Sequence, residues 1–210
     1  MAPERLRLHL ATGNAHKVAE FQRLADAGTG QGARRYEIVP ATPMPSVVED
    51  SGTFAGNARK KATALQATLP PGAWVLADDS GVCVDALGGA PGVDSAYYAG
   101  PQHDAAANLQ KLARAMRDVP ADRRTARFVC VLFLAGPGGI AEAFEGHCAG
   151  RLRDHPAGGA GFGYDPLFVP EGYDRTYAEL SEEEKNTISH RGRAWLKLAS
   201  WLDRTAATVR

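Results

Sequence analysis

Seven consecutive apolar residues, Phe128-Val129-Cys130-Val131-Leu132-Phe133-Leu134, decide the fold class. An unbroken run of this kind is typical of a central strand that is covered on both faces, as in proteins that mix helices and sheet. The turn Gly136-Pro137-Gly138-Gly139 ends the run, and residues 140–148 are expected to return beside it as a hairpin partner. The run therefore predicts the middle of a mixed sheet.

Strands and helices alternate on both sides of that run. Alternation of apolar and polar residues, or a short buried run, predicts the strands, and apolar stripes at helical spacing predict the helices. The expected strands are 6–10, 36–39, 74–77 and 82–84. The expected helices carry the stripes Val18 to Leu24, Phe54 to Leu69, Ala105 to Met116 and Ala194 to Leu202. This order predicts one α/β domain over residues 1–210.

Composition restricts the class of protein. A chain of 210 residues with 44% hydrophobic content can bury a full core. Because 24 basic residues balance 24 acidic ones, no overall field would attract nucleic acid or a membrane. Residues 1–10 have no signal-peptide core and no run could span a bilayer, so we expect a cytoplasmic protein. The three cysteines, Cys83, Cys130 and Cys148, are expected to be buried thiols.

Two adjacent carboxylates stand out in the segment Leu76-Ala77-Asp78-Asp79-Ser80-Gly81-Val82, where an apolar run stops and a glycine turn is expected. Ionised side chains are costly to bury unless they are paired or bound to a metal, and hard oxygen ligands suit Mg²⁺. The pair therefore indicates a metal and general-base site. An ordinary acidic turn is the alternative.

Two basic segments could hold phosphate. The segment TGNAHK, residues 12–17, presents backbone N–H groups and Lys17 at a helix start, where an anion is favoured, although a simple helix cap is equally consistent. The spacing is not that of a Walker A loop. The next helix carries Lys61 beside an acidic loop with Glu49 and Asp50. This lysine could reach a terminal phosphate while the acids hold a metal, whereas a solvated helix face is the alternative.

Two further clusters could bind a base. In FGYDP, residues 162–166, Phe162 or Tyr164 could supply a stacking face and Asp165 an acceptor, although core aromatic residues in a turn are equally consistent. In EKNTISHRG, residues 184–192, a capping box with Ser181 explains only Glu184. The other residues of this segment include three hydrogen-bond donors, Lys185, His190 and Arg191. Such donors suit a purine with a keto group at carbon six.

Together these segments resemble the inosine triphosphate pyrophosphatase family, which hydrolyses aberrant purine nucleoside triphosphates such as dITP, ITP and XTP. The resemblance covers nearly the whole chain and rests on residues 12–17, 53–62, 76–100, 161–180 and 184–192. It implies an elongated mixed β-sheet with flanking helices that form two lobes around a nucleotide cleft. It also implies a homodimer that needs Mg²⁺ and releases pyrophosphate.

The resemblance also implies a role for individual residues. Asp79 would be the catalytic proton acceptor, and Glu49, Asp78 and Asp79 would bind Mg²⁺. The residues expected to contact the substrate are Thr12, Gly13, Asn14, Ala15, His16, Lys17, Lys61, Ser80, Phe162, Gly163, Tyr164, Asp165, Lys185, His190 and Arg191. A pyrophosphatase for another modified nucleotide and a nucleotide sensor without turnover remain alternatives.

Three departures from the family pattern bear on the site. Gly56 stands where relatives usually have glutamate, so the helix start should be weaker. The spacing from Glu49 to Thr53 is one residue short, so either Glu49 or Asp50 could be the metal ligand. Tyr97 replaces an arginine that is common in that loop. No residue explains how guanine would be rejected, and the preferred substrate, the dimer surface and the number of metal ions are not predicted.

Overall fold

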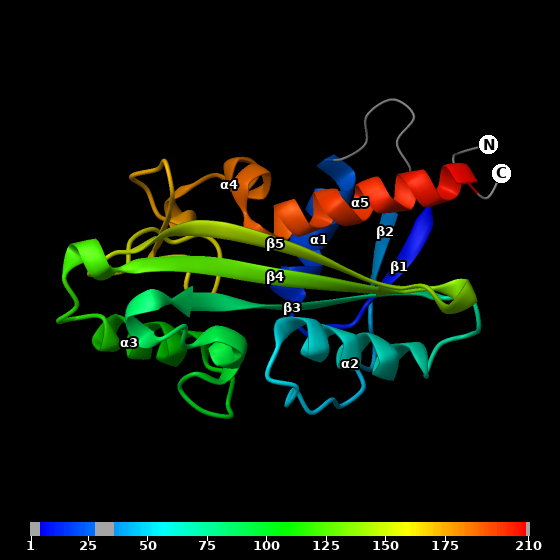
Figure 1. Cartoon of the computed structure of the whole chain (residues 1–210), viewed down its shortest axis with the longest axis horizontal. Helices are drawn as coiled ribbons and strands as arrows, with labels where there is room; N and C mark the ends of the chain where they lie inside the picture. Colours follow the sequence, from blue (N-terminus) through cyan, green and yellow to red (C-terminus); the bar gives the residue numbers. More distant parts are fainter. Residues whose placement is uncertain (1–4, 28–35, 209–210) are drawn as a thin grey trace. The chain divides into compact units, whose positions relative to one another are not determined.

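The structure is a computed structural model that describes residues 5–27 and 36–208. One six-stranded sheet has the order β2-β1-β3-β4-β5-β6. Figure 1 labels β1 to β5. The strands are β1 (Leu6–Leu10), β2 (Tyr36–Pro40), β3 (Trp74–Val84), β4 (Thr125–Ala135), β5 (Ala141–Leu152) and β6 (Phe168–Pro170). The helices are α1 (Ala15–Ala27), α2 (Phe54–Gln66), α3 (Ala105–Ala115), α4 (Glu182–Ile188) and α5 (His190–Thr208).

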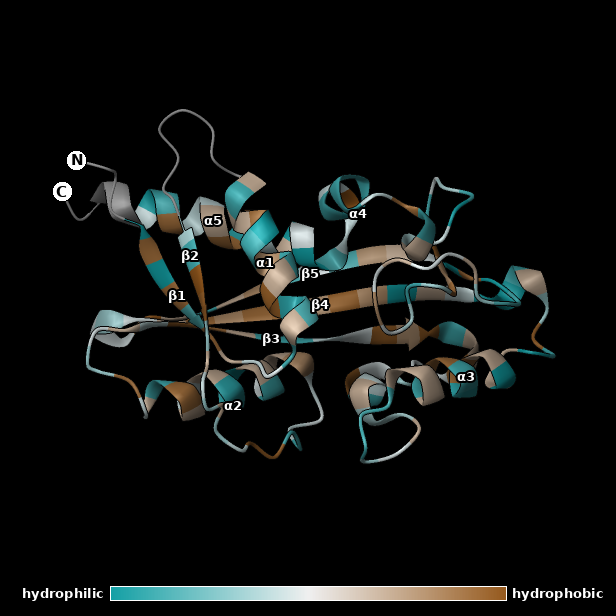
Figure 2. Ribbon diagram, turned by 180° about the vertical axis from the view of Figure 1, so that it is seen from behind, coloured by the Kyte–Doolittle hydropathy of each residue, from teal (hydrophilic) through white to brown (hydrophobic). Residues whose placement is uncertain are grey.

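The sheet is mixed, as the apolar run predicted. β1 pairs in parallel with β2 and β3, whereas β5 and β6 are antiparallel. The run 128–134 lies in β4, between β3 and β5 in the strand order, and it is hydrophobic over most of its length in Figure 2. The predicted helices are all present, but the three-residue strand β6 was not predicted. Residues 1–4 of the segment tested for a signal peptide lie outside the described residues.

The predicted glycine turn after the acidic pair is wrong. β3 is a single strand of 11 residues that continues through Asp78, Asp79 and Gly81. Gly81 is required by packing, since a Cβ at this position would collide with the carbonyl of Gly92 and the hydroxyl of Ser95. A glycine inside a strand often marks such a close approach of another backbone segment. The two carboxylates are therefore part of a strand interior.

The chain divides into two compact units. Unit 1 comprises residues 1–79, 131–145 and 191–210, and unit 2 comprises residues 80–130 and 146–190. Both units are assembled from separate parts of the sequence, and β3, β4 and β5 contribute residues to each. The expectations of one domain and of two lobes around a cleft stay predictions.

Unit 1 has helices on both faces of its part of the sheet. α2 packs Ala58, Ala62 and Leu65 against the strands, where it meets a cluster that includes Val75 and Ala77 of β3. α1 and α5 lie on the opposite face (Figure 1). Since β3 is covered on both sides, its buried residues do not alternate with exposed ones, and a charged side chain in it has to find its partners inside the protein.

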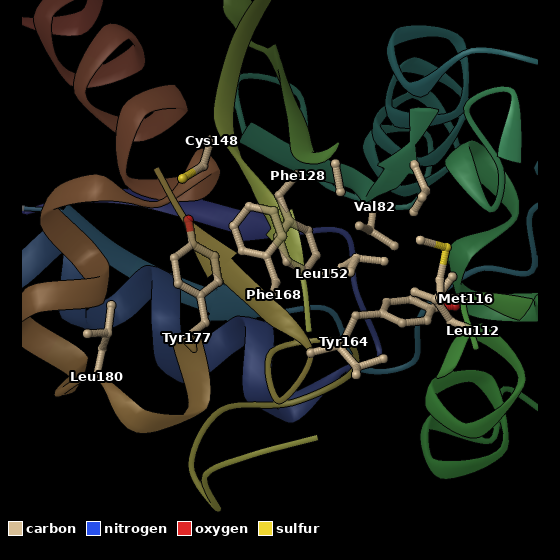
Figure 3. Close-up of a cluster of buried hydrophobic side chains, with 13 residues drawn as sticks. Val82, Leu112, Met116, Phe128, Cys148, Leu152, Tyr164, Phe168, Tyr177 and Leu180 are labelled. Carbon is tan, nitrogen blue, oxygen red and sulfur yellow. The ribbon is translucent and has the colours of Figure 1, made fainter. Parts of the chain in front are cut away.

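Unit 2 is held together by a cluster of 13 buried residues (Figure 3). Its aromatic side chains include Phe128, Phe168 and Tyr177, and the centroids of the Phe128 and Phe168 rings lie 4.8 Å apart, edge to face. Such pairs contribute about 0.5–1.5 kcal/mol beyond the area that they bury. α3 adds Leu112, and Met116 follows it, which confirms the predicted apolar stripe.

The cysteines agree with the expectation from the sequence. Cys83, Cys130 and Cys148 are buried free thiols, as predicted. Within residues 5–27 and 36–208, no helix is both long enough and apolar enough to cross a bilayer.

Candidate active site

The two adjacent aspartates lie on opposite faces of β3. Asp78 Oδ2 is 2.6 Å from the Lys17 ammonium of α1, whereas Asp79 Oδ1 is 2.8 Å from the Lys61 ammonium of α2. Successive side chains of a strand point to opposite faces, so a continuous β3 separates these two carboxylates. In this structure the two carboxylates therefore pair with different lysines, and a site that they share stays a prediction.

Asp78 belongs to a buried chain of alternating charges. Besides Lys17, its Oδ2 atom lies 3.6 Å from Arg191 Nε, and Arg191 Nη1 lies 3.3 Å from Glu20 Oε2. Burial alone would raise the pKa of Asp78, but the charges of Lys17 and Arg191 outweigh it and hold that pKa well below its usual range. Asp78 therefore stays ionised as a fixed negative charge.

Asp79 shares a lysine with Glu49. The Lys61 ammonium lies 2.8 Å from Asp79 Oδ1 and 2.9 Å from Glu49 Oε2. Burial raises the pKa of Asp79 to about 6 despite the opposing charge of Lys61, and repulsion from Asp78 adds only a smaller part. Within the described part of the chain, the buried Oδ2 atom of Asp79 has no hydrogen-bond partner. This oxygen is thus available to accept a proton or to bind a cation.

The predicted set of three metal ligands is not assembled. Among residues 5–27 and 36–208, no three His, Cys, Asp or Glu side chains are grouped so that they could hold a metal ion. Asp78 is occupied on the other face of β3, whereas Glu49 and Asp79 converge on one ammonium group and offer hard oxygen atoms. The exposed Asp50 instead pairs with the ammonium of Lys60. The donor chemistry therefore fits Mg²⁺ at Glu49 and Asp79, and it favours Glu49 over Asp50.

The segment TGNAHK forms the start of α1. Asn14 Oδ1 accepts hydrogen bonds from the backbone N–H groups of His16, at 2.9 Å, and Lys17, at 3.3 Å. Thr12 Oγ1 accepts from the N–H of Asn14 at 3.1 Å. The segment thus forms a helix cap, which was one of the two alternatives, and Lys17 forms an ion pair with Asp78. Phosphate binding by Thr12, Gly13, Asn14, Ala15, His16 and Lys17 stays a prediction.

FGYDP and Lys185 form a compact cluster in unit 2. Asp165 Oδ2 accepts from the Lys185 ammonium at 2.6 Å and from the backbone N–H of Phe162 at 2.9 Å. The same ammonium lies 5.5 Å from the centroid of the half-buried Phe162 ring. The Tyr164 hydroxyl donates to the Ser95 carbonyl at 2.7 Å, and its ring belongs to the hydrophobic cluster. The structure favours the core alternative for Tyr164 and leaves Phe162 as the candidate stacking face.

The remaining predicted contacts also lie in unit 2. His190 is 1% exposed and stacks on Phe128, with ring centroids 4.7 Å apart. This burial gives His190 a packing role, and its contact with a base stays a prediction. Ser80 follows Asp79 in β3 and is half-buried. Gly163 adopts a positive φ of 63° in the turn after Phe162, a conformation that favours glycine.

Comparison with known proteins identifies the family of this chain. Residues 8–201 match the sequence pattern of the Ham1 family. The chain belongs to the Ham1 family. A dITP/XTP pyrophosphatase of Opitutus terrae is 59% identical over 93% of this chain and 98% of its own length. The solved structure of the Staphylococcus aureus Ham1 protein superposes with a TM-score of 0.79 at 35% identity, covering 95% of this chain and 99% of that one.

A second relative of this family shows the same agreement. A dITP/XTP pyrophosphatase of Streptomyces coelicolor is 48% identical over 91% of this chain and 94% of its own length. The resemblance on which the family was predicted is therefore confirmed.

Sequence reasoning missed two buried polar residues of this Ham1 chain. Glu20, 3% exposed, lies one helical turn after Lys17, and a charge among the apolar positions of α1 could have pointed to it. Asn57, 1% exposed, lies one turn before Lys61 on the same face of α2. Glu20 pairs with Arg191, which was predicted for the site, whereas Asn57 contacts Ser51, which was not.

Proposed function

We propose that this chain hydrolyses non-standard purine nucleoside triphosphates, such as dITP, XTP and ITP, to the monophosphate and pyrophosphate. The names of its relatives, at up to 59% identity over most of the chain, support this activity. The observation that carries it is the environment of Asp79: a buried carboxylate with a pKa near 6, one oxygen without a partner among the described residues, and a lysine beside it. That combination suits a base in phosphoryl chemistry.

In the proposed reaction, water attacks the α-phosphorus. The oxygen of water forms a bond to this phosphorus, the bond from the α-phosphorus to the α,β-bridging oxygen breaks, and pyrophosphate leaves with that oxygen. Asp79 Oδ2 orients the water and accepts its proton. Lys61 and Lys17 offer ammonium groups to the phosphate oxygens, and each is already held in place by a carboxylate.

The charge balance of unit 1 supports a need for Mg²⁺. On the Asp79 face of β3 one cation, Lys61, contacts two carboxylates, Glu49 and Asp79, whereas the two cations and two carboxylates of the Asp78 group balance one another on the other face. A site with this excess of negative charge would repel a polyanionic substrate. Mg²⁺ held by Glu49 and Asp79 would supply positive charge to the phosphates and to the leaving pyrophosphate.

Base recognition is proposed for the donors predicted from sequence. Lys185, ordered by Asp165, and the ring of Phe162 would contact the base, with Arg191 and His190 reading the six-keto edge. Adenine presents an amino donor at that position, and a site built to donate can discriminate by roughly 10⁴-fold. We further propose that the enzyme is a homodimer of the cytoplasm.

The site of attack can be tested by isotope labelling. When the purified protein hydrolyses ITP in H₂¹⁸O with Mg²⁺, the label should appear in the monophosphate and not in pyrophosphate. Asp79→Asn should lower turnover by about 10²-fold or more, whereas the matched change Asp50→Asn should have little effect. Label in inorganic phosphate, or full turnover by Asp79→Asn, would exclude the proposed reaction.

A further inference from the structure

Three side chains of α2 contact the loop that carries Glu49. Lys60 contacts the carbonyl of Val48 at 3.3 Å and the carboxylate of Asp50. Lys61 contacts Glu49, and Asn57 contacts the next residue of the loop, Ser51. The pair of Asp50 with Lys60 is exposed, whereas the contacts of its two neighbours with α2 are partly buried. The loop is thus positioned by side chains of α2.

Asn57 is the most buried of the three α2 residues that make these contacts. Its Oδ1 atom accepts a hydrogen bond from the backbone N–H of Ser51 at 3.1 Å and from the Ser51 hydroxyl at 2.8 Å. Asn57 is 1% exposed, so its side-chain oxygen is shielded from water although Ser51 itself is exposed. The contact therefore fixes the backbone of Ser51 on α2.

The distance between the two contacts along the loop matches the distance between them along α2. Asn57 and Lys61 are four residues apart on one face of α2, a rise of about 6 Å. Glu49 and Ser51 are two residues apart, and an extended chain covers about 6.6 Å in that distance. Ser51 held at Asn57 therefore brings the Glu49 carboxylate to the ammonium of Lys61, 2.9 Å away.

Gly56 makes room for this arrangement. A Cβ at residue 56 would lie 2.6 Å from the Ser51 Cβ and 2.9 Å from Thr53 Oγ1. A real side chain does not tolerate such distances, so Ser51 would have to move. Gly56, which departs from the family pattern, thus leaves the space that the Ser51 side chain occupies.

We propose that Asn57 is a positioning residue for Glu49, acting through Ser51, and that Gly56 is the residue that lets Ser51 occupy this position. The inference deepens the proposed function, on which it rests for the role of Glu49 in binding Mg²⁺. Residues that orient a metal ligand typically change metal affinity by about 10–100-fold when they are removed.

Two measurements on the full chain test this role. Asn57→Ala should weaken the binding of Mg²⁺ alone, measured by calorimetry without nucleotide, by about 10-fold, and Ser51→Ala should have a smaller effect. Independently of any metal, hydrogen exchange of the Ser51 amide should accelerate about 10-fold or more in Asn57→Ala.

The matched control is Thr53→Ala, which removes the N-cap of α2 and leaves Asn57 in place. The Thr53 side chain accepts from the N–H of Gly56 at 3.1 Å, and losing such a cap destabilises a helix without removing the contact to Ser51. It should leave Mg²⁺ affinity and Ser51 exchange within about 2-fold of the original protein. Equal effects of Thr53→Ala and Asn57→Ala would overturn the proposal. If the original protein binds no Mg²⁺, the metal step of the proposed function fails, and hydrogen exchange alone decides the role of Asn57.

Discussion

Replacing Lys61 by methionine should destabilise the protein in a pH-dependent way. The substitution keeps an apolar side chain and removes the ammonium group between Asp79 and Glu49. Removing one partner of a buried ion pair costs about 3–5 kcal/mol, because a charge is left buried and unpaired. The Glu49 side chain is 25% exposed and can gain water, so we expect a loss of about 3 kcal/mol at pH 8.

The loss should shrink as pH falls. The pKa of Asp79 in the folded protein is raised from 3.8 to about 6, mainly by burial. Relative to high pH, protonation of Asp79 therefore stabilises the folded state fully below pH 3.8, and this stabilisation is lost as pH rises through 6. Without Lys61 that pKa moves higher still, and the stability of the variant keeps falling above pH 6. At pH 5 Asp79 is mostly protonated in both proteins, so the difference should fall to about 1 kcal/mol.

The assay is urea unfolding of the metal-free protein at pH 5 and pH 8. Lys60→Met is the matched control, since Lys60 is the neighbouring lysine of α2, and its pair with Asp50 is exposed. Exposed pairs contribute about 0–1 kcal/mol, so this variant should change little at either pH. A loss for Lys61→Met that is independent of pH, or no larger than that of Lys60→Met, would refute the reasoning.

Three further outcomes are expected. Gly56→Ala should destabilise the protein by about 1–3 kcal/mol in thermal or urea unfolding, although alanine is normally the better helix former, because Ser51 has to move; a gain in stability would contradict this packing. Tyr164→Phe should lose about 1–3 kcal/mol in the same assays, since it leaves the buried carbonyl of Ser95 without its 2.7 Å donor; an unchanged midpoint would argue against that bond. The pH profile of kcat/KM should fall on the acid side as Asp79 becomes protonated, at or below pH 6, because bound Mg²⁺ lowers the pKa further; an acid limb above pH 7 would point to another base.

Much of the fold could be predicted from local sequence patterns. The run 128–134 required a strand covered on both faces, and apolar stripes gave the helices, because periodicity reflects which side of an element is buried. β3 was misread because Gly81 was taken as a turn signal. A glycine is needed at this position because Gly92 and Ser95 approach it closely, and these residues are not local to it in sequence.

The site shows the same division between local and distant information. The residue types at 78 and 79 suggested an acidic centre, but their assignment to opposite faces depended on β3 being continuous. Asp78 is held by Arg191, more than a hundred residues away, and no local pattern states that contact. The capping role of Asn14, in contrast, was among the sequence alternatives, because caps are local.

The most direct test of the proposed function is the release of pyrophosphate from a panel of nucleotides. The purified protein with Mg²⁺ is given ITP, XTP, dITP, ATP and GTP at equal concentrations, and the initial rates of pyrophosphate formation are compared. We predict rapid hydrolysis of ITP, XTP and dITP and rates for ATP that are lower by roughly 10⁴-fold. Comparable cleavage of ATP and ITP would contradict recognition of the keto purine, and no cleavage of any nucleotide would contradict the enzymatic function itself.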